Sequence, residues 1–87
     1  MRIGFDESKR VSNLIKHGGL DFKDIDRSFF DSGKIAIAKS GRLMAIGPFR
    51  GRLISIVFTR LGTESLSIVS MRPASRKERR FYEDTVT

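Results

Sequence analysis

Four arginines lie close together in the C-terminal part of the sequence, at Arg72, Arg76, Arg79 and Arg80. If this segment is helical, the last three share one helical face and their guanidinium groups can converge. The planar fork of an arginine binds two oxygens of one phosphate, and a helix that begins near Ser75 would add backbone N–H donors. The spacing therefore allows the arginines to form a phosphate-binding surface. The same arginines could equally form a solvated face, or pair with Glu83 and with acidic groups of a neighbouring helix.

His17 is the single histidine of the chain. An imidazole is the only side chain whose ordinary pKa is close to neutrality, which makes His17 a candidate general acid or base. It also stands directly before Gly18, a residue type that commonly ends helices, so it could instead cap helix carbonyl groups. On the sequence alone both interpretations stay open.

The sequence also lacks the residues that several other classes of chemistry need. There is no cysteine, which excludes thiol nucleophiles, disulfides and cysteine-based zinc sites. No cluster of His, Asp and Glu has the spacing of metal ligands, and we expect neither a metal ion nor another cofactor. No apolar run is long enough for a signal peptide or a membrane span, so we expect a cytoplasmic protein without membrane contact.

The charge is divided unevenly along the 87 residues, which make up one domain, 1–87. Residues 1–32 carry six basic and six acidic groups. Residues 33–87 carry eleven basic and four acidic groups, and therefore account for the whole net charge of +7. This asymmetry is typical of a protein that binds a nucleic acid or an acidic partner. Basic charge that only keeps the protein soluble is the alternative.

Two helices are predicted in the first third of the chain. Asp6 can cap the first, which carries Val11, Leu14 and Ile15 on one face and ends near Gly18. The second is expected to begin at Asp21 and to end at the Asp31-Ser32-Gly33 turn. Its residues Phe22, Ile25 and Phe29 repeat with helical spacing, which predicts a buried stripe.

From residue 34 the pattern changes to short strands. Four segments rich in branched and aromatic residues are predicted strands: Ile35–Lys39, Arg42–Pro48, Arg52–Arg60 and Glu64–Arg72. The short connections between them fit only antiparallel hairpins. In the third strand Ile54, Ile56 and Phe58 alternate with smaller or polar residues, and we expect the two helices to cover this apolar face. Arg2–Phe5 could add an edge strand.

A last helix is predicted from Ser75 to about Asp84, because Ser75 and Glu78 form an S-x-x-E capping box. The predicted order is thus (β)ααββββα. This is an α+β domain in which helices pack against a twisted antiparallel sheet.

Short motifs stand in a characteristic order along nearly the whole chain: Phe5-Asp6, Lys9, Asn13, Lys16-His17-Gly18, Phe22, Phe29-Phe30-Asp31, Gly41-Arg42, Gly51-Arg52-Leu53 and Val57-Phe58-Thr59. The most recognisable motif closes the chain, from Ser70-Met71-Arg72 through Ala74-Ser75 and Glu78-Arg79 to Tyr82. Together they resemble the BrnT family of toxins, whose closing motif reads S-A-R-x-A-[ST]-x-x-E-R-x-x-Y.

The resemblance implies a RelE-like fold and a ribonuclease that acts as the toxin of a type II toxin–antitoxin system. It also implies a BrnA-like antitoxin that neutralises the toxin in a hetero-oligomer. In such a system the antitoxin carries the DNA-binding element, so that the toxin meets DNA only through it, and the complex represses its own operon.

RNA cleavage without a metal needs a group that takes the 2′-hydroxyl proton and cations that stabilise the charged phosphate. On this resemblance we expect catalytic roles for His17, Arg72, Arg76, Arg79 and Tyr82. Further contacts with RNA are expected from Lys16, Arg52 and Arg80. Tyr82 could instead pack its ring against the sheet.

Two other interpretations stay open. The chain could be a basic RNA- or DNA-binding module without catalysis, or an inactive member of the toxin family that serves its partner as a co-repressor.

Overall fold

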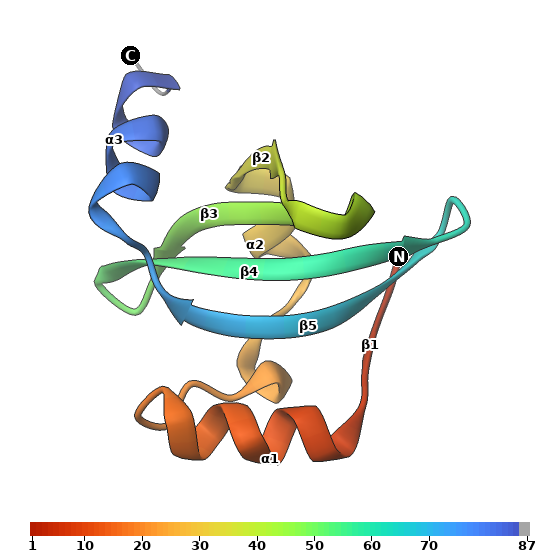
Figure 1. Ribbon diagram of the computed structural model, residues 1–87. Coiled ribbons are helices and arrows are strands. Elements are labelled where there is room, and N and C mark those ends of the chain that lie inside the picture. Colours follow the sequence, from red (N-terminus) through yellow and green to blue (C-terminus); the bar gives the residue numbers. More distant parts are fainter. Residues whose placement is uncertain (86–87) are drawn as a thin grey trace.

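The computed structural model describes residues 1–85, and a five-stranded sheet forms its centre (Figure 1). The elements along the chain are β1 (Arg2–Phe5), α1 (Glu7–Lys16), the 3₁₀ turn η1 (Phe22–Asp24), α2 (Arg27–Ser32), β2 (Lys34–Ile37), the 3₁₀ turn η2 (Lys39–Gly41), β3 (Leu43–Phe49), β4 (Arg52–Leu61), β5 (Ser65–Pro73) and α3 (Arg76–Thr85). The α+β class is confirmed.

Strands β2 to β5 form the predicted antiparallel meander. The order across the sheet is β1-β5-β4-β3-β2, so β1 is an edge strand, and it pairs with β5 in parallel. A β-bulge interrupts the pairing of β4 with β5: Val57 pairs with Ser70, whereas the next residue, Phe58, pairs with Ile68. Val69 is therefore an extra residue on β5.

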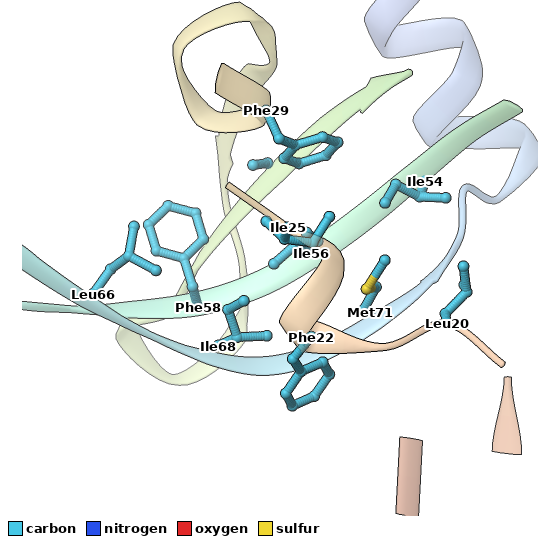
Figure 2. Close-up of a cluster of buried hydrophobic side chains, with 11 residues drawn as sticks. Leu20, Phe22, Ile25, Phe29, Ile54, Ile56, Phe58, Leu66, Ile68 and Met71 are labelled. Atoms are coloured by element: carbon cyan, nitrogen blue, oxygen red, sulfur yellow. The ribbon is translucent and has the colours of Figure 1, made fainter. Parts of the chain in front are cut away.

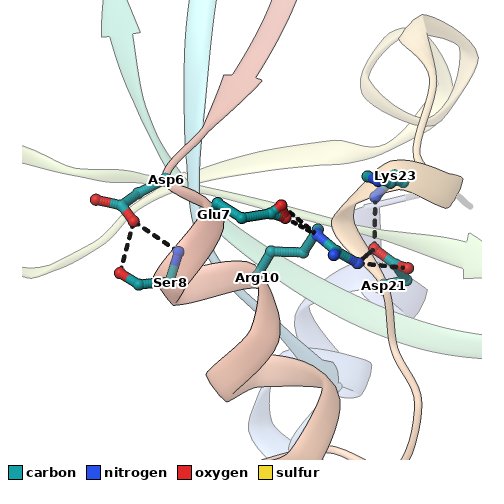
Figure 3. Close-up of polar contacts among 6 residues, drawn as sticks. All are labelled: Asp6, Glu7, Ser8, Arg10, Asp21 and Lys23. Atoms are coloured by element: carbon teal, nitrogen blue, oxygen red, sulfur yellow. Dashed lines mark hydrogen bonds and ion pairs between the residues drawn. The ribbon is translucent and has the colours of Figure 1, made fainter.

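Helix α1 begins and ends where the sequence predicts. The Asp6 carboxylate accepts a hydrogen bond from the Ser8 N–H at 2.8 Å, His17 is the C-cap, and Gly18 follows with φ of +59°. An ion pair between Arg10 and Asp21, with N and O atoms 3.0 Å apart, links the helix to the segment that follows (Figure 3). The apolar face of α1 contributes little to the core, since Ile15 is 81% exposed.

Asn13 is the buried residue of α1, and its side chain fixes the helix to the sheet. The Asn13 amide nitrogen donates to the Met71 carbonyl at 2.8 Å, and the Met71 N–H donates to the Asn13 amide oxygen at 3.0 Å. A further bond at 3.0 Å joins the amide nitrogen to the Leu20 carbonyl. The side chain thus pairs with β5 as the backbone of a neighbouring strand would.

The prediction of one continuous second helix is wrong. Ile25 and Asp26 have extended backbones between η1 and α2. The Asp26 carboxylate accepts a hydrogen bond from the Ser28 N–H at 2.9 Å and so begins a new helix. The stripe Phe22, Ile25 and Phe29 is nevertheless buried, as predicted. Its residues reach the core from η1, from the extended residue after it and from α2, rather than from one face of a single helix.

The core lies between the segment of residues 20–29 and one face of the sheet (Figure 2). Ile54, Ile56 and Phe58 of β4 are buried there, which confirms the predicted apolar face. The other face is not left to solvent along its whole length, because Ser55 is also fully buried. Helix α3 covers this second face near Ser55, whose hydroxyl donates a hydrogen bond to Glu78.

The capping box at the start of α3 is confirmed. The Glu78 N–H donates to Ser75 Oγ at 3.2 Å, and the Ser75 N–H donates to the Glu78 carboxylate at 2.8 Å.

None of the helices within residues 1–85 has the length and the apolar content to span a membrane.

Candidate functional site

A groove of about 800 Å³ lies between α3 and the face of the sheet that α1 and α2 leave open. Apolar side chains of β2 to β5 form its floor: Ala36, Met44, Ile46, Val57 and Val69. Four cations surround this floor, Lys39, Arg42, Arg72 and Lys77, together with the carboxylate of Glu78 and the ring of Phe81. The groove is therefore apolar at its base and positively charged around it.

The carboxylate of Glu78 holds Arg72 in a fixed position in this groove. Arg72 Nη1 lies 2.6 Å from Glu78 Oε1, and Arg72 Nη2 lies 2.7 Å from Oε2, which is the two-pronged geometry of strong pairs. Ser55 Oγ donates to the same carboxylate at 2.8 Å. Hydrogen bonds from Arg72, from the Ser75 backbone and from Ser55 lower the pKa of Glu78 to about 2. Glu78 therefore joins the last helix, β4 and Arg72 in one unit.

A smaller hollow of about 280 Å³ surrounds His17, between α1 and β5. Its lining includes Lys9, Lys16, Val69 and Ser70, and the last two also line the larger groove. Burial, followed by the charges of Lys16 and Arg72, lowers the pKa of His17. The imidazole is therefore mostly neutral at pH 7. Because Val69 and Ser70 line both cavities, the hollow of His17 adjoins the larger groove.

We call the groove and the hollow together the basic groove. Its cations are Lys9, Lys16, Lys39, Arg42, Arg72 and Lys77. Among its described lining residues, Glu78 is the one carboxylate, and it is paired with Arg72. A surface of this size with so few opposing charges attracts polyanions.

The four arginines near the C-terminus, which are close together in the sequence, lie in two separate groups in the structure. Arg76, Arg79 and Arg80 share one face of α3 and line a hollow on its other side, with Ala74, Glu83 and Asp84. Arg72 lies in the basic groove instead. The acidic groups of the second segment pair elsewhere, Asp31 with Arg27 and Asp24 with Arg50.

Of the other predicted site residues, Lys16 lines the basic groove, whereas Arg52 and Tyr82 do not. Lys16 lines it beside His17. Arg52 is exposed at the start of β4, and strand alternation places it on the face of Ile54, opposite to that of Ser55 and Arg72. Tyr82 is half-buried on α3 and lines neither part of the basic groove among the described residues.

The sequence patterns do not identify several residues that line the basic groove: Lys9, Lys39, Arg42, Lys77 and Phe81. Lys9 and Arg42 belong to motifs that resemble the BrnT family, but a sequence motif does not predict the direction of a side chain. Lys77 and Phe81 are four residues apart and therefore share a helical face, which could have identified them as a pair.

Comparison with known proteins decides the family. The family model for the ribonuclease toxin BrnT of type II toxin–antitoxin systems matches residues 5–78. The chain belongs to the BrnT family. The matched residues include His17, Arg72 and Glu78, and they end before Arg79, Arg80 and Tyr82.

A solved BrnT structure agrees with this assignment. The 1.1 Å crystal structure of the Brucella abortus ribonuclease toxin BrnT has 49% sequence identity to this chain and a TM-score of 0.79. The similarity covers 87% of this chain and 99% of the Brucella chain. A search of the curated proteins gave no match.

Proposed function

We propose that this BrnT-family chain cleaves RNA in the basic groove and needs no metal ion for the reaction. The observation that carries the proposal is that the hollow around His17 and the groove that holds Arg72 share Val69 and Ser70, while Glu78 fixes the Arg72 guanidinium. These two residues supply the two things that RNA cleavage requires, a proton acceptor and a fixed positive charge.

In this mechanism the 2′-oxygen of a ribose attacks the adjacent phosphorus. Neutral His17 takes the proton of the 2′-hydroxyl as the new O–P bond forms. The bond from phosphorus to the 5′-oxygen breaks, and the leaving oxygen takes up a proton from water in the open groove. The products are a 2′,3′-cyclic phosphate and a free 5′-hydroxyl, and no oxidant or cofactor enters the balance.

Arg72 stabilises the extra negative charge on the phosphate during this step. The pairing with Glu78 occupies protons on both terminal nitrogens, and Nη1 also approaches the Pro73 carbonyl at 3.5 Å. The Nε proton and one Nη2 proton are left for phosphate oxygens. Because the guanidinium is held before RNA binds, little reorganisation opposes the reaction.

The other residues of the groove bind the substrate. Lys16, Arg42 and Lys77 contact backbone phosphates, and the ring of Phe81 offers a surface on which a base stacks. Arg76, Arg79 and Arg80 contact RNA beyond the cleaved bond, because they line the other side of α3. Arg52 and Tyr82 have no role in this proposal.

We also propose that a BrnA-like antitoxin neutralises the chain in a hetero-oligomer. The antitoxin carries the DNA-binding element, and the complex represses its own operon. The support is the type II toxin–antitoxin system that the family description names.

Cleavage is tested with purified protein and a defined RNA in the presence of EDTA. We expect cleavage to persist, and both His17→Ala and Arg72→Lys to reduce its rate about 100-fold. Arg27→Ala is the matched control, since Arg27 is 70% exposed on α2, and its rate should equal that of the parent chain. Arg79→Ala should raise KM and leave kcat nearly unchanged, as expected for a contact outside the reacting bond.

RNA that is bound but stays intact would show that the chain is a binding module, or an inactive family member that acts as a co-repressor. Cleavage that EDTA abolishes and Mg²⁺ restores would contradict the metal-independent mechanism. Thermal unfolding of each variant separates a lost group from a lost fold.

A further inference from the structure

The outer side of β2 is unpaired, since no strand within the described residues lies beyond it in the sheet. On its inner side the Ala38 N–H donates to the Arg42 carbonyl at 2.9 Å, directly after the pair Ile37–Leu43. Antiparallel strands alternate between hydrogen-bonded and non-hydrogen-bonded pairs. Ala36 and Lys34 are therefore bonded to β3, whereas the N–H and C=O groups of Ile35 and Ile37 point outward.

The side chains of the same two residues are also exposed. Ile37 is 88% exposed and Ile35 is 47% exposed. Two β-branched side chains thus stand beside two N–H and two C=O groups that have no strand partner among the described residues, on a strand of four residues. This arrangement is a template for an added strand.

The charges around this edge indicate what kind of strand fits it. Alternation places Lys34 and Ala36 on the side of the basic groove, and Lys39 and Arg42 line the groove nearby. A second copy of this chain would bring the same cations against them, and like charges across an edge oppose pairing. An acidic segment would neutralise them.

We propose that the antitoxin adds an extended segment to β2, in which apolar and acidic residues alternate. This inference rests on the proposed antitoxin partner. The apolar residues of the segment pack against Ile35 and Ile37 on one face of the sheet. The acidic residues, on the other face, reach Lys34, Lys39 and Arg42, so that the segment covers one side of the basic groove and competes with RNA. RNA itself is disfavoured at this edge, because aliphatic side chains and strand amides offer it no stacking surface.

Amide hydrogen exchange tests the pairing directly, with the chain free and in complex with the cognate antitoxin after co-expression. In the free chain the amides of Ile35 and Ile37 exchange rapidly and that of Ala36 slowly. In the complex we expect the exchange of Ile35 and Ile37 to slow at least 100-fold. Fast exchange of both amides in the complex would overturn the proposal.

A matched pair of variants tests the side chains. Ile37→Lys should weaken binding of the antitoxin at least tenfold in calorimetry. Ile15→Lys, the same substitution at an isoleucine 81% exposed on α1, should leave the affinity within twofold. Equal effects of the two variants, or none of either, would contradict the assignment to β2.

The readout is antitoxin affinity, so it does not depend on whether RNA is cleaved. If the parent chain does not cleave RNA and Ile37→Lys still loses antitoxin affinity, the result supports antitoxin binding at β2 and contradicts the proposed RNA cleavage. If the free chain forms a dimer and Ile37→Lys makes it monomeric, the outer side of β2 binds a second copy of the chain, which would overturn the proposal. A loss of oligoribonucleotide binding with unchanged antitoxin affinity would assign it to RNA.

Discussion

The pKa of His17 links the geometry of the basic groove to the rate of the proposed reaction. Burial and the charge of Lys16 lower this pKa from its ordinary 6.5, so the neutral base accumulates below that pH. The cleavage rate should therefore rise through a midpoint below pH 6.5 and reach a plateau near neutrality. Lys16→Gln removes one positive charge, which raises the pKa of His17 and moves the midpoint to higher pH.

The pH–rate profile of the purified chain checks this prediction. Lys23→Gln is the control, because Lys23 lies on η1 and does not contribute to the pKa shift of His17. A midpoint that Lys16→Gln leaves in place would mean that another group takes the proton.

Glu78 makes the stability of the chain depend on acid. Its pKa is about 2 in the folded chain against an ordinary 4.5, so its contribution is complete above pH 4.5 and is lost as the pH falls toward 2. Glu78→Gln should lower the free energy of unfolding at pH 7 by about 1–3 kcal/mol, because Arg72 loses a charged partner. The difference between variant and parent should shrink below pH 4.5.

Urea unfolding at a series of pH values measures this difference. Glu83→Gln on the same helix is the control, since Glu83 is exposed, and it should change little. A constant difference between pH 7 and pH 2 would show that the carboxylate charge is not what stabilises the helix.

Among the secondary structure elements, α2 and β3 meet where Gly33 and Gly47 lie against each other. A Cβ on Gly33 would lie 2.9 Å from the Phe29 carbonyl oxygen and 3.1 Å from that of Ile46. Gly33→Ala should therefore lower the free energy of unfolding by about 1–3 kcal/mol, as overpacking does. Gly4→Ala, whose Cβ would lie 3.8 Å from its nearest neighbour, should stay within about 0.5 kcal/mol of the parent. Thermal and urea unfolding of both variants provide the comparison.

The elements show what local sequence patterns can and cannot predict. Caps such as Asp6 and Ser75 act through bonds to the next few residues, so the bounds of α1 and α3 follow from the sequence. The break at Asp26 was missed, although Asp26 and Ser28 carry a capping signal of the same kind. The apolar repeat from Phe22 to Phe29 favoured one helix, and the packing of those side chains tolerates two.

At the scale of the whole molecule, the division of charge predicted a basic surface but not its place. The sequence suggests the arginines of α3 as the basic surface, yet Arg76, Arg79 and Arg80 lie on the side of α3 that faces away from the basic groove. The cations of the groove come from α1, η2, β5 and α3 and from Arg42, the residue between η2 and β3. The pairing of the strands and the packing of α1 and α3 against the sheet bring these residues together, and neither is a local property of the sequence.

The bulge at Val69 determines on which face of the sheet Arg72 lies. Leu66 and Ile68 are buried in the core, and strict alternation from them would send Ser70 and Arg72 to the same face. The extra residue changes the phase of the strand. After it, Met71 enters the core, and Arg72 lies opposite Ser55 and reaches Glu78. A single inserted residue thus lets one strand complete the core along its whole length and still present a cation to the opposite face.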